Sequence, residues 1–115
     1  MFEVKWTEEA DRQYKKLRED AEASVSSRQK KGKKKTSRAE GLFKQTHKTL
    51  KLLTQNPQHP SLQTHQYHSL EHPYNPEEKV FEAYAQHKTP GAYRVFWCYG
   101  PEKGQLTIIA ITPHP

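Results

Sequence analysis

The chain has 115 residues, enough for one domain with a modest core and too few for two. Only 32% of the residues are hydrophobic and the mean hydropathy is -1.12, which excludes a membrane span, and the N-terminal residues lack the apolar stretch of a signal peptide. We therefore expect a soluble, cytoplasmic protein. Cys98 is the single cysteine, which excludes a disulfide framework and a zinc site built on paired thiolates.

The net charge of +6 comes from one short segment of the chain. Residues 28–38 contain no acid and carry the basic side chains Arg28, Lys30, Lys31, Lys33, Lys34, Lys35 and Arg38. In the remaining residues, basic and acidic side chains nearly balance. A polyanion such as RNA is the partner that this segment predicts. The alternative is a solvated loop whose charge serves solubility.

The first half of the chain predicts a strand and two helices. Residues 2–6 alternate apolar and polar side chains, as a strand with one buried face does. Thr7 is the expected N-cap of a helix that runs to about Ser27, with acidic residues in its first turn. Ser37 and Glu40 have the spacing of a capping box, which predicts a second helix that ends at Asn56. The two helices form a hairpin with the basic segment 28–38 at its tip.

The second half of the chain predicts extended structure. Strands are expected at residues 65–70, 80–86, 93–99 and 106–112, with turns at 87–91 and 100–104. The order β-α-α-β-β-β-β predicts a single α+β domain over residues 1–115. Its two layers are an antiparallel sheet and the helical hairpin on one face of that sheet.

The segments FEVKWT, ADRQYKKL, GAYRVFWCY and QLTIIAITPHP stand in this order along the chain. Together they resemble the RelE/ParE toxin superfamily of bacterial toxin-antitoxin systems, over nearly all of the chain except the basic tip. The resemblance implies a RelE-like or YoeB-like toxin, a metal-free endoribonuclease that cuts mRNA on the ribosome and is held inactive by a cognate antitoxin. It implies no small-molecule cofactor and no membrane partner.

The resemblance also implies roles for individual residues. Arg94 matches the family arginine that holds the scissile phosphate, and His114 matches the near-terminal histidine that acts in proton transfer in YoeB-like members. Where RelE carries two lysines on the preceding strand, this chain has Glu82 and Tyr84. The candidate catalytic residues are therefore Arg94, His114, Glu82 and Tyr84, with Glu82 as a candidate base.

The pairing of two strands decides whether these residues meet. If residues 84 and 94 are opposite each other, Glu82 and Arg94 share one face of the sheet. If residues 85 and 94 are opposite, they do not. In the structural alternative, Arg94 only pairs with an acid such as Glu82, and His114 lies in a frayed terminus.

The remaining candidates concern binding. Lys30, Lys31, Lys33, Lys34 and Lys35 are expected to contact ribosomal RNA, and His65 and His68 to line an RNA groove. No metal site is expected from His65, His68 and His72, because no cysteine or acid cluster completes a coordination shell. Two alternatives to the ribonuclease remain: a ParE-like toxin that inhibits gyrase, and a non-catalytic module that binds nucleic acid or protein.

Overall fold

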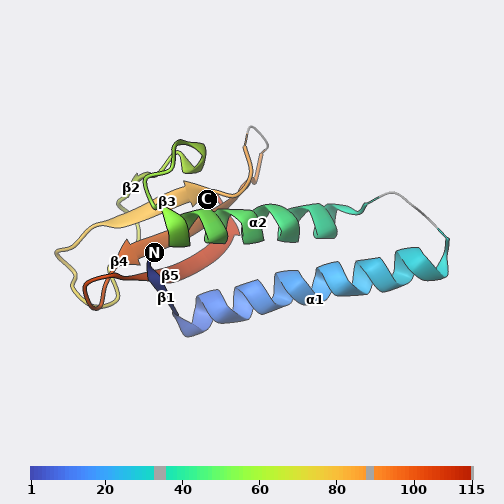
Figure 1. Cartoon of the computed structure of the whole chain (residues 1–115), viewed down its shortest axis with the longest axis horizontal. Helices are drawn as coiled ribbons and strands as arrows, with labels where there is room; N and C mark the ends of the chain where they lie inside the picture. Colours follow the sequence, from blue (N-terminus) through green and yellow to red (C-terminus); the bar gives the residue numbers. More distant parts are fainter. Residues whose placement is uncertain (33–35, 88–89, 115) are drawn as a thin grey trace.

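The computed structural model describes residues 1–32, 36–87 and 90–114. Figure 1 shows two long helices beside a sheet. In chain order the elements are β1 (Glu3–Trp6), α1 (Glu8–Lys30), α2 (Arg38–Gln55), the short 3-10 helix η1 (Pro60–Leu62), β2 (His65–Tyr67), β3 (Val80–Tyr84), β4 (Tyr93–Tyr99) and β5 (Gln105–Pro113).

Both helices begin at the predicted caps. The Thr7 hydroxyl accepts a hydrogen bond from the Ala10 N–H at 3.1 Å. The Ser37 hydroxyl accepts from the Glu40 N–H at 3.2 Å, and the Glu40 carboxylate accepts from the Ser37 N–H at 2.9 Å, which completes the capping box. Helix α1 continues to Lys30 rather than ending near Ser27, so the basic segment begins inside the helix.

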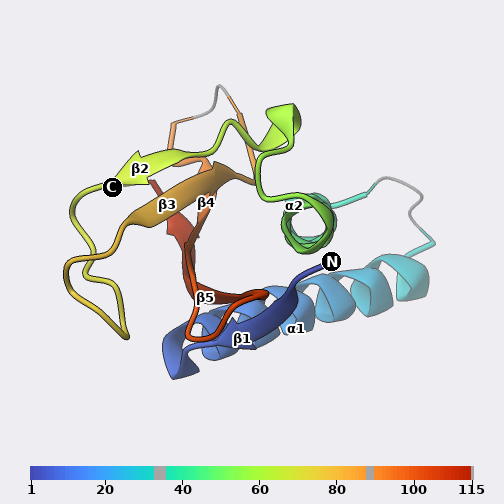
Figure 2. The ribbon, with the colours of Figure 1, turned by 60° about the vertical axis from the view of Figure 1, so that its left-hand side comes forward.

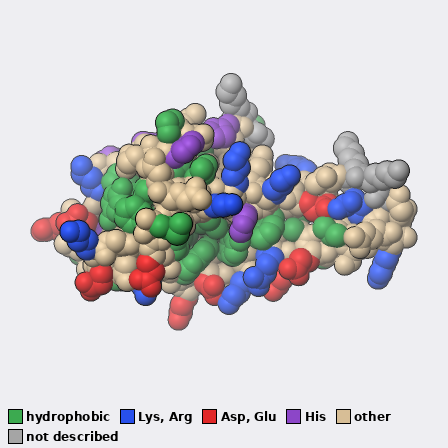
Figure 3. Space-filling view, in the orientation of Figure 1, with side chains coloured by type: hydrophobic (Ala, Val, Ile, Leu, Met, Phe, Trp, Pro, Cys, Tyr) green, Lys and Arg blue, Asp and Glu red, His purple; other side chains and the backbone are tan. Residues whose placement is uncertain are grey.

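The outer face of α1 is polar. Ion pairs between residues one helical turn apart join Lys15 to Asp11 and Lys16 to Asp20. Figure 3 shows basic and acidic side chains side by side along this helix. Neither α1 nor α2 carries an apolar stretch long enough to cross a bilayer.

The sheet has five strands in the order β1-β5-β4-β3-β2. The pairs β2–β3, β3–β4 and β4–β5 are antiparallel, as predicted, but β1 runs parallel to β5, with Glu3 opposite Gln105. The expectation of a wholly antiparallel sheet is wrong for this one pair. Alternation along a strand reveals which face is buried, whereas the neighbour of β1 is decided by the long return of the chain through both helices.

Two strands are shorter than predicted. Strand β2 ends at Tyr67 instead of Leu70, and β3 ends at Tyr84 instead of Gln86. The β3–β4 ladder stops there because the N–H groups of Ala85 and Gln86 both donate to the Tyr93 carbonyl at 3.2 Å. Propensity along one strand carries no information about where its partner stops pairing.

The helices cover one face of the sheet, which Figure 2 shows from the side. The core joins Ala10, Leu17 and Leu53 of the helices to sheet residues Ala83, Ala85, Val95, Trp97, Leu106, Ile108 and Ile111. Because side chains alternate along a strand, the residues between these on β3 and β4 point to the opposite face. That second face, which we call the open face, carries the candidate site.

Candidate functional site

The register of β3 and β4 brings the predicted residues together. Tyr84 lies opposite Arg94 and Glu82 lies opposite Phe96. This is the first of the two pairings considered from the sequence, and it places Glu82, Tyr84 and Arg94 on the open face.

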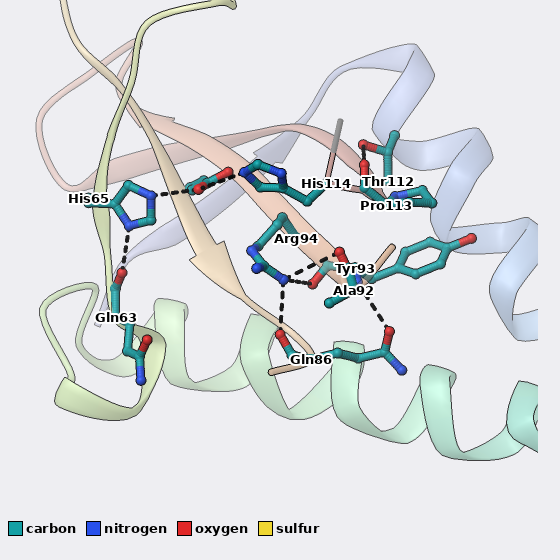
Figure 4. A network of polar contacts seen from close by, with 10 residues as sticks. Gln63, His65, Gln86, Ala92, Tyr93, Arg94, Thr112, Pro113 and His114 are labelled. Carbon is teal, nitrogen blue, oxygen red and sulfur yellow. Dashed lines mark hydrogen bonds and ion pairs between the residues drawn. The ribbon is translucent and has the colours of Figure 1, made fainter. Parts of the chain in front are cut away.

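Glu82 is at the centre of the site and is almost wholly buried, with 1% of its surface exposed. Its Oε1 atom lies 2.5 Å from Nε2 of His65 and 3.5 Å from Nε2 of His114. His65 is the cross-strand neighbour of Glu82 on β2, whereas His114 follows β5 at the other side of β4. Dashed lines in Figure 4 mark these two contacts at the labelled rings of His65 and His114.

Arg94 is held by the backbone at the end of the β3–β4 ladder. Its Nη1 donates to the carbonyls of Gln86 at 3.0 Å and of Ala92 and Tyr93 at 3.3 Å (Figure 4). The guanidinium carbon lies 3.7 Å from the centre of the Tyr84 ring, a cation–π contact. Among residues 1–32, 36–87 and 90–114, no acid lies within ion-pair distance of Arg94, so the expected alternative of a pair with Glu82 is not observed.

Part of the Arg94 guanidinium is unused. Within the described part of the chain, its Nε is buried without a hydrogen-bond partner and its Nη2 makes no hydrogen bond. These donors are the ones that a bound anion would satisfy, because arginine donates in a fixed fork.

His114 is anchored rather than frayed. Its N–H donates to the Ala92 carbonyl at 2.9 Å, which continues the backbone pairing beyond β5. The side chain is 42% exposed, whereas the neighbouring Glu82 side chain is 2% exposed. His114 is therefore a group of this cluster that solvent or a ligand reaches directly.

The other predicted binding residues lie elsewhere. His68 is exposed and lies beyond the end of β2, outside the cluster. Lys30 is the last residue of α1 and Lys31 is its C-cap, whereas Lys33, Lys34 and Lys35 lie outside the described residues. Asp20 of α1 lines a groove together with Tyr93 and Pro113, the chain neighbours of Arg94 and His114. Lys30 lies about 15 Å beyond Asp20 along the axis of α1. The described lysines are thus not brought to the cluster.

His72 has a structural place. It is buried, its Nε2 lies 3.0 Å from the Tyr99 carbonyl, and its Nδ1 accepts from the N–H groups of Tyr74 and Asn75. It holds the loop between β2 and β3 against β4. In the described ranges, no three His, Cys, Asp or Glu side chains are arranged to hold a metal ion.

Sequence reasoning missed the contact between His65 and Glu82. The two residues are separated by β2 and a long loop, and their pairing depends on a register that no turn motif specifies. The pattern of histidines indicated polar function near residue 65 without locating it.

The comparison with solved structures concerns the whole chain. A YoeB/ParE toxin from Agrobacterium tumefaciens superposes with a TM-score of 0.62 and 7% identity, over 98% of this chain and 99% of that one. The chain has the RelE/ParE toxin fold. A copper-bound mutant toxin from Helicobacter pylori is also similar, with a TM-score of 0.51, 12% identity and coverage of 99% and 96%. No family model and no curated protein sequence matches the chain. The fold expected from the resemblance is therefore confirmed, at sequence identities that carry no residue roles.

Proposed function

We propose that this chain is a toxin of the RelE/ParE type that cleaves mRNA on the ribosome and is neutralised by a cognate antitoxin. The observation that supports the proposal is the meeting of Glu82, Arg94 and His114 on the open face of a RelE/ParE fold. An arginine with unused donors, an accessible imidazole and a carboxylate behind it are the groups that phosphodiester cleavage requires.

In this reaction the ribose 2′-oxygen attacks the adjacent phosphorus and the bond from phosphorus to the 5′-oxygen breaks. The 2′-hydroxyl loses its proton and the 5′-oxygen gains one, which leaves a cyclic phosphate and a free 5′-hydroxyl. The unused donors of Arg94 stabilise the charge on the phosphate. His114 carries out one proton transfer, and Tyr84, whose ring lies under Arg94, is the candidate for the other.

Glu82 acts through His114 in this proposal. The sequence makes Glu82 a candidate base, but a carboxylate with 2% of its side chain exposed does not touch RNA without movement of its neighbours. At 3.5 Å from His114 Nε2 it orients and stabilises an imidazolium, as the buried acid of a catalytic triad does.

The variant His114→Gln tests the proposal. It preserves the backbone bond to Ala92 and the approximate size of the side chain but carries no proton between groups near neutral pH. We expect normal thermal unfolding and at least about a hundredfold slower single-turnover cleavage of ribosome-bound mRNA. His47→Gln is the matched control, since it makes the same change at an exposed histidine of α2, outside the cluster. Full activity of a folded His114→Gln protein would contradict the assigned role.

A second candidate is inhibition of DNA gyrase by binding. Arg94 is only 8% exposed and its Nη1 is committed to three carbonyls, which favours a structural arginine. Supercoiling by purified gyrase separates the candidates. Inhibition of supercoiling without new cuts in translated transcripts would replace the ribonuclease by the gyrase inhibitor.

The proposed antitoxin has an apolar surface to occupy. A groove of about 410 Å³ lies between β1 and the helices, and Trp6, Tyr14 and Leu50 contribute to its lining. Apolar surface of this kind belongs to interaction sites. We expect Trp6→Glu to leave toxicity intact and to weaken neutralisation by the antitoxin, measured as growth during co-expression. Unchanged neutralisation would place the antitoxin elsewhere.

A further inference from the structure

His65 uses both ring nitrogens inside the protein. Its Nδ1 lies 3.0 Å from the Gln63 carbonyl oxygen, and its Nε2 lies 2.5 Å from Glu82 Oε1 (Figure 4). A carbonyl oxygen only accepts, so Nδ1 carries a hydrogen and donates it. The short contact with Glu82 Oε1 then occupies Nε2, the other ring nitrogen. No nitrogen of His65 is left to take a proton from RNA.

The Gln63 carbonyl is held in place by an unusual backbone conformation. Gln63 has φ 47° and ψ 40°, and in the described ranges it is the one residue other than glycine with positive φ. It ends the helix η1, where its N–H donates to the Pro60 carbonyl at 3.1 Å. A left-handed conformation is unfavourable for a residue with a side chain, and such strain persists where the surroundings impose it.

Glu82 is consequently fixed through one of its two oxygens. Oε1 faces both imidazoles, whereas Oε2 is buried and has no hydrogen-bond partner within the described part of the chain. The Tyr84 ring packs edge-on against the His65 ring, with centroids 5.8 Å apart, which limits the rotation of His65. The two successive contacts, from the Gln63 carbonyl to His65 and from His65 to Glu82, thus set the direction in which the Glu82 carboxylate meets His114.

We propose that His65 is a positioning residue, which holds the Glu82 carboxylate so that Glu82 in turn orients His114. The inference deepens the proposed ribonuclease function and rests on it for its effect on catalysis. It replaces the expectation that His65 lines a groove and contacts RNA directly. The geometric part concerns the free protein alone and is testable without activity.

Two substitutions separate the two contacts of His65, because each retains one contact and removes the other. The side-chain amide nitrogen of glutamine lies near the place of Nε2, so His65→Gln retains a donor to Glu82 and loses the bond to Gln63. The amide nitrogen of asparagine lies near the place of Nδ1, so His65→Asn retains the bond to Gln63 and does not reach Glu82. His47→Gln and His47→Asn make the same changes at an exposed histidine of α2, outside the cluster.

We expect His65→Gln to retain most of the cleavage rate at saturation and His65→Asn to lose up to about a hundredfold. The concentration of ribosome-bound mRNA that gives half of the maximal cleavage rate should be unchanged in both variants. Equal loss of rate in both variants would overturn the proposal, because only a general structural role treats them alike. A change confined to half-saturation would also overturn it, in favour of direct RNA contact.

A second measurement separates this proposal from the proposed function. The ring ¹⁵N resonances of His114 in the free protein report its contact with Glu82. We expect them to move in His65→Asn and in Glu82→Gln and to stay in place in His65→Gln. If the wild-type protein cleaves no RNA, the ribonuclease proposal fails while this measurement still decides the positioning. If the His114 ring resonances do not move in His65→Asn, the positioning role of His65 is overturned.

Discussion

At the scale of single residues, Arg94 combines a structural role with the catalytic role that we propose for it. Three backbone carbonyls and the Tyr84 ring hold its guanidinium at the end of the β3–β4 ladder. The sequence presents folding and phosphate binding as alternatives that a mutant would separate. In the structure the two roles are compatible, because the same bonds that stabilise the turn also fix the direction of the unused donors.

We therefore expect Arg94→Ala to lower both stability and activity. Loss of the buried hydrogen bonds costs about 1–3 kcal/mol of unfolding free energy, measured by denaturant titration. Arg94→Lys restores a charge but neither the fork nor the stacking, so cleavage should remain low even where the protein is folded. A folded Arg94→Lys protein with wild-type cleavage would show that phosphate binding requires a positive charge at this position but not the guanidinium fork.

At Gln63, unlike at Arg94, we expect a substitution that does not lower the stability of the protein. Glycine adopts the left-handed conformation of this residue without steric cost, and the backbone carbonyl that accepts from His65 is retained. We expect Gln63→Gly to leave stability unchanged or to raise it by up to about 1 kcal/mol, whereas Gln63→Val should lower it. Thermal unfolding of the two variants beside wild type checks the prediction. If Gln63→Gly lowers the melting temperature, the backbone at Gln63 is not strained.

Cys98 is buried in β4, and its burial raises the pKa of the thiol to about 11. At neutral pH the thiol is protonated and inaccessible, so the reactive thiolate is nearly absent. We expect no alkylation of the native protein by iodoacetamide at neutral pH and full alkylation in denaturant, measured by mass spectrometry. Rapid labelling of the native state would show that β4 opens.

At the scale of elements, the helical hairpin is joined by an ion pair at its outer end. Arg28 of α1 contacts the Glu40 carboxylate in the first turn of α2, and the hydroxyls of Ser24 and Ser37 are 2.5 Å apart. The hydrogen bonds from Arg28 and from the Ser37 N–H lower the pKa of Glu40 to about 2. These contacts stabilise the hairpin beyond the edge of the sheet, where few core residues reach it.

The Glu40 contribution to stability depends on pH. Because its pKa is lower in the folded chain, the carboxylate binds protons more weakly there than after unfolding. The contribution is complete above the ordinary range of about 4.5 and is lost as the pH falls toward about 2. We expect the melting temperature of wild type to fall more steeply over this range than that of Glu40→Gln. Glu22→Gln, which removes an exposed acid near Arg18, is the control. Parallel pH curves for wild type and Glu40→Gln would contradict the pairing.

At the scale of the whole molecule, the described lysines Lys30 and Lys31 and the cluster around Glu82 lie at different ends. The molecule measures 51 × 26 × 24 Å, and Figure 1 shows the C-terminal end of α1 far from the sheet. Lys30 and Lys31 are exposed at that end. This separation supports the proposal that the segment attaches the chain to RNA and takes no part in the chemistry.

Replacing Lys30, Lys31, Lys33, Lys34 and Lys35 by glutamine tests this proposal. We expect weaker association with ribosomes and a flatter dependence of affinity on salt, because fewer counterions are released on binding. The rate of cleavage at saturation should be unchanged. An unaltered salt slope would mean that the segment only serves solubility.

The sequence by itself determined the local structure of this protein. Thr7, Ser37 and Glu40 specify where the helices begin, because capping depends on neighbours within four residues. The alternation along residues 93–99 specifies a strand. The likeness of these segments in order to the RelE/ParE toxins indicated the fold, and Arg94 and His114 as candidates.

Only the tertiary structure decided which strands and side chains meet. The parallel pairing of β1 with β5, the register that places Tyr84 opposite Arg94, and the contact of His65 with Glu82 each join residues far apart in the chain. A shift of one residue in the β3–β4 register would turn Glu82 into the helical core, and both registers satisfy the same local propensities. The packing of the helices against one face selects between them, because it buries Ala83, Val95 and Trp97 and leaves the charged side chains on the other.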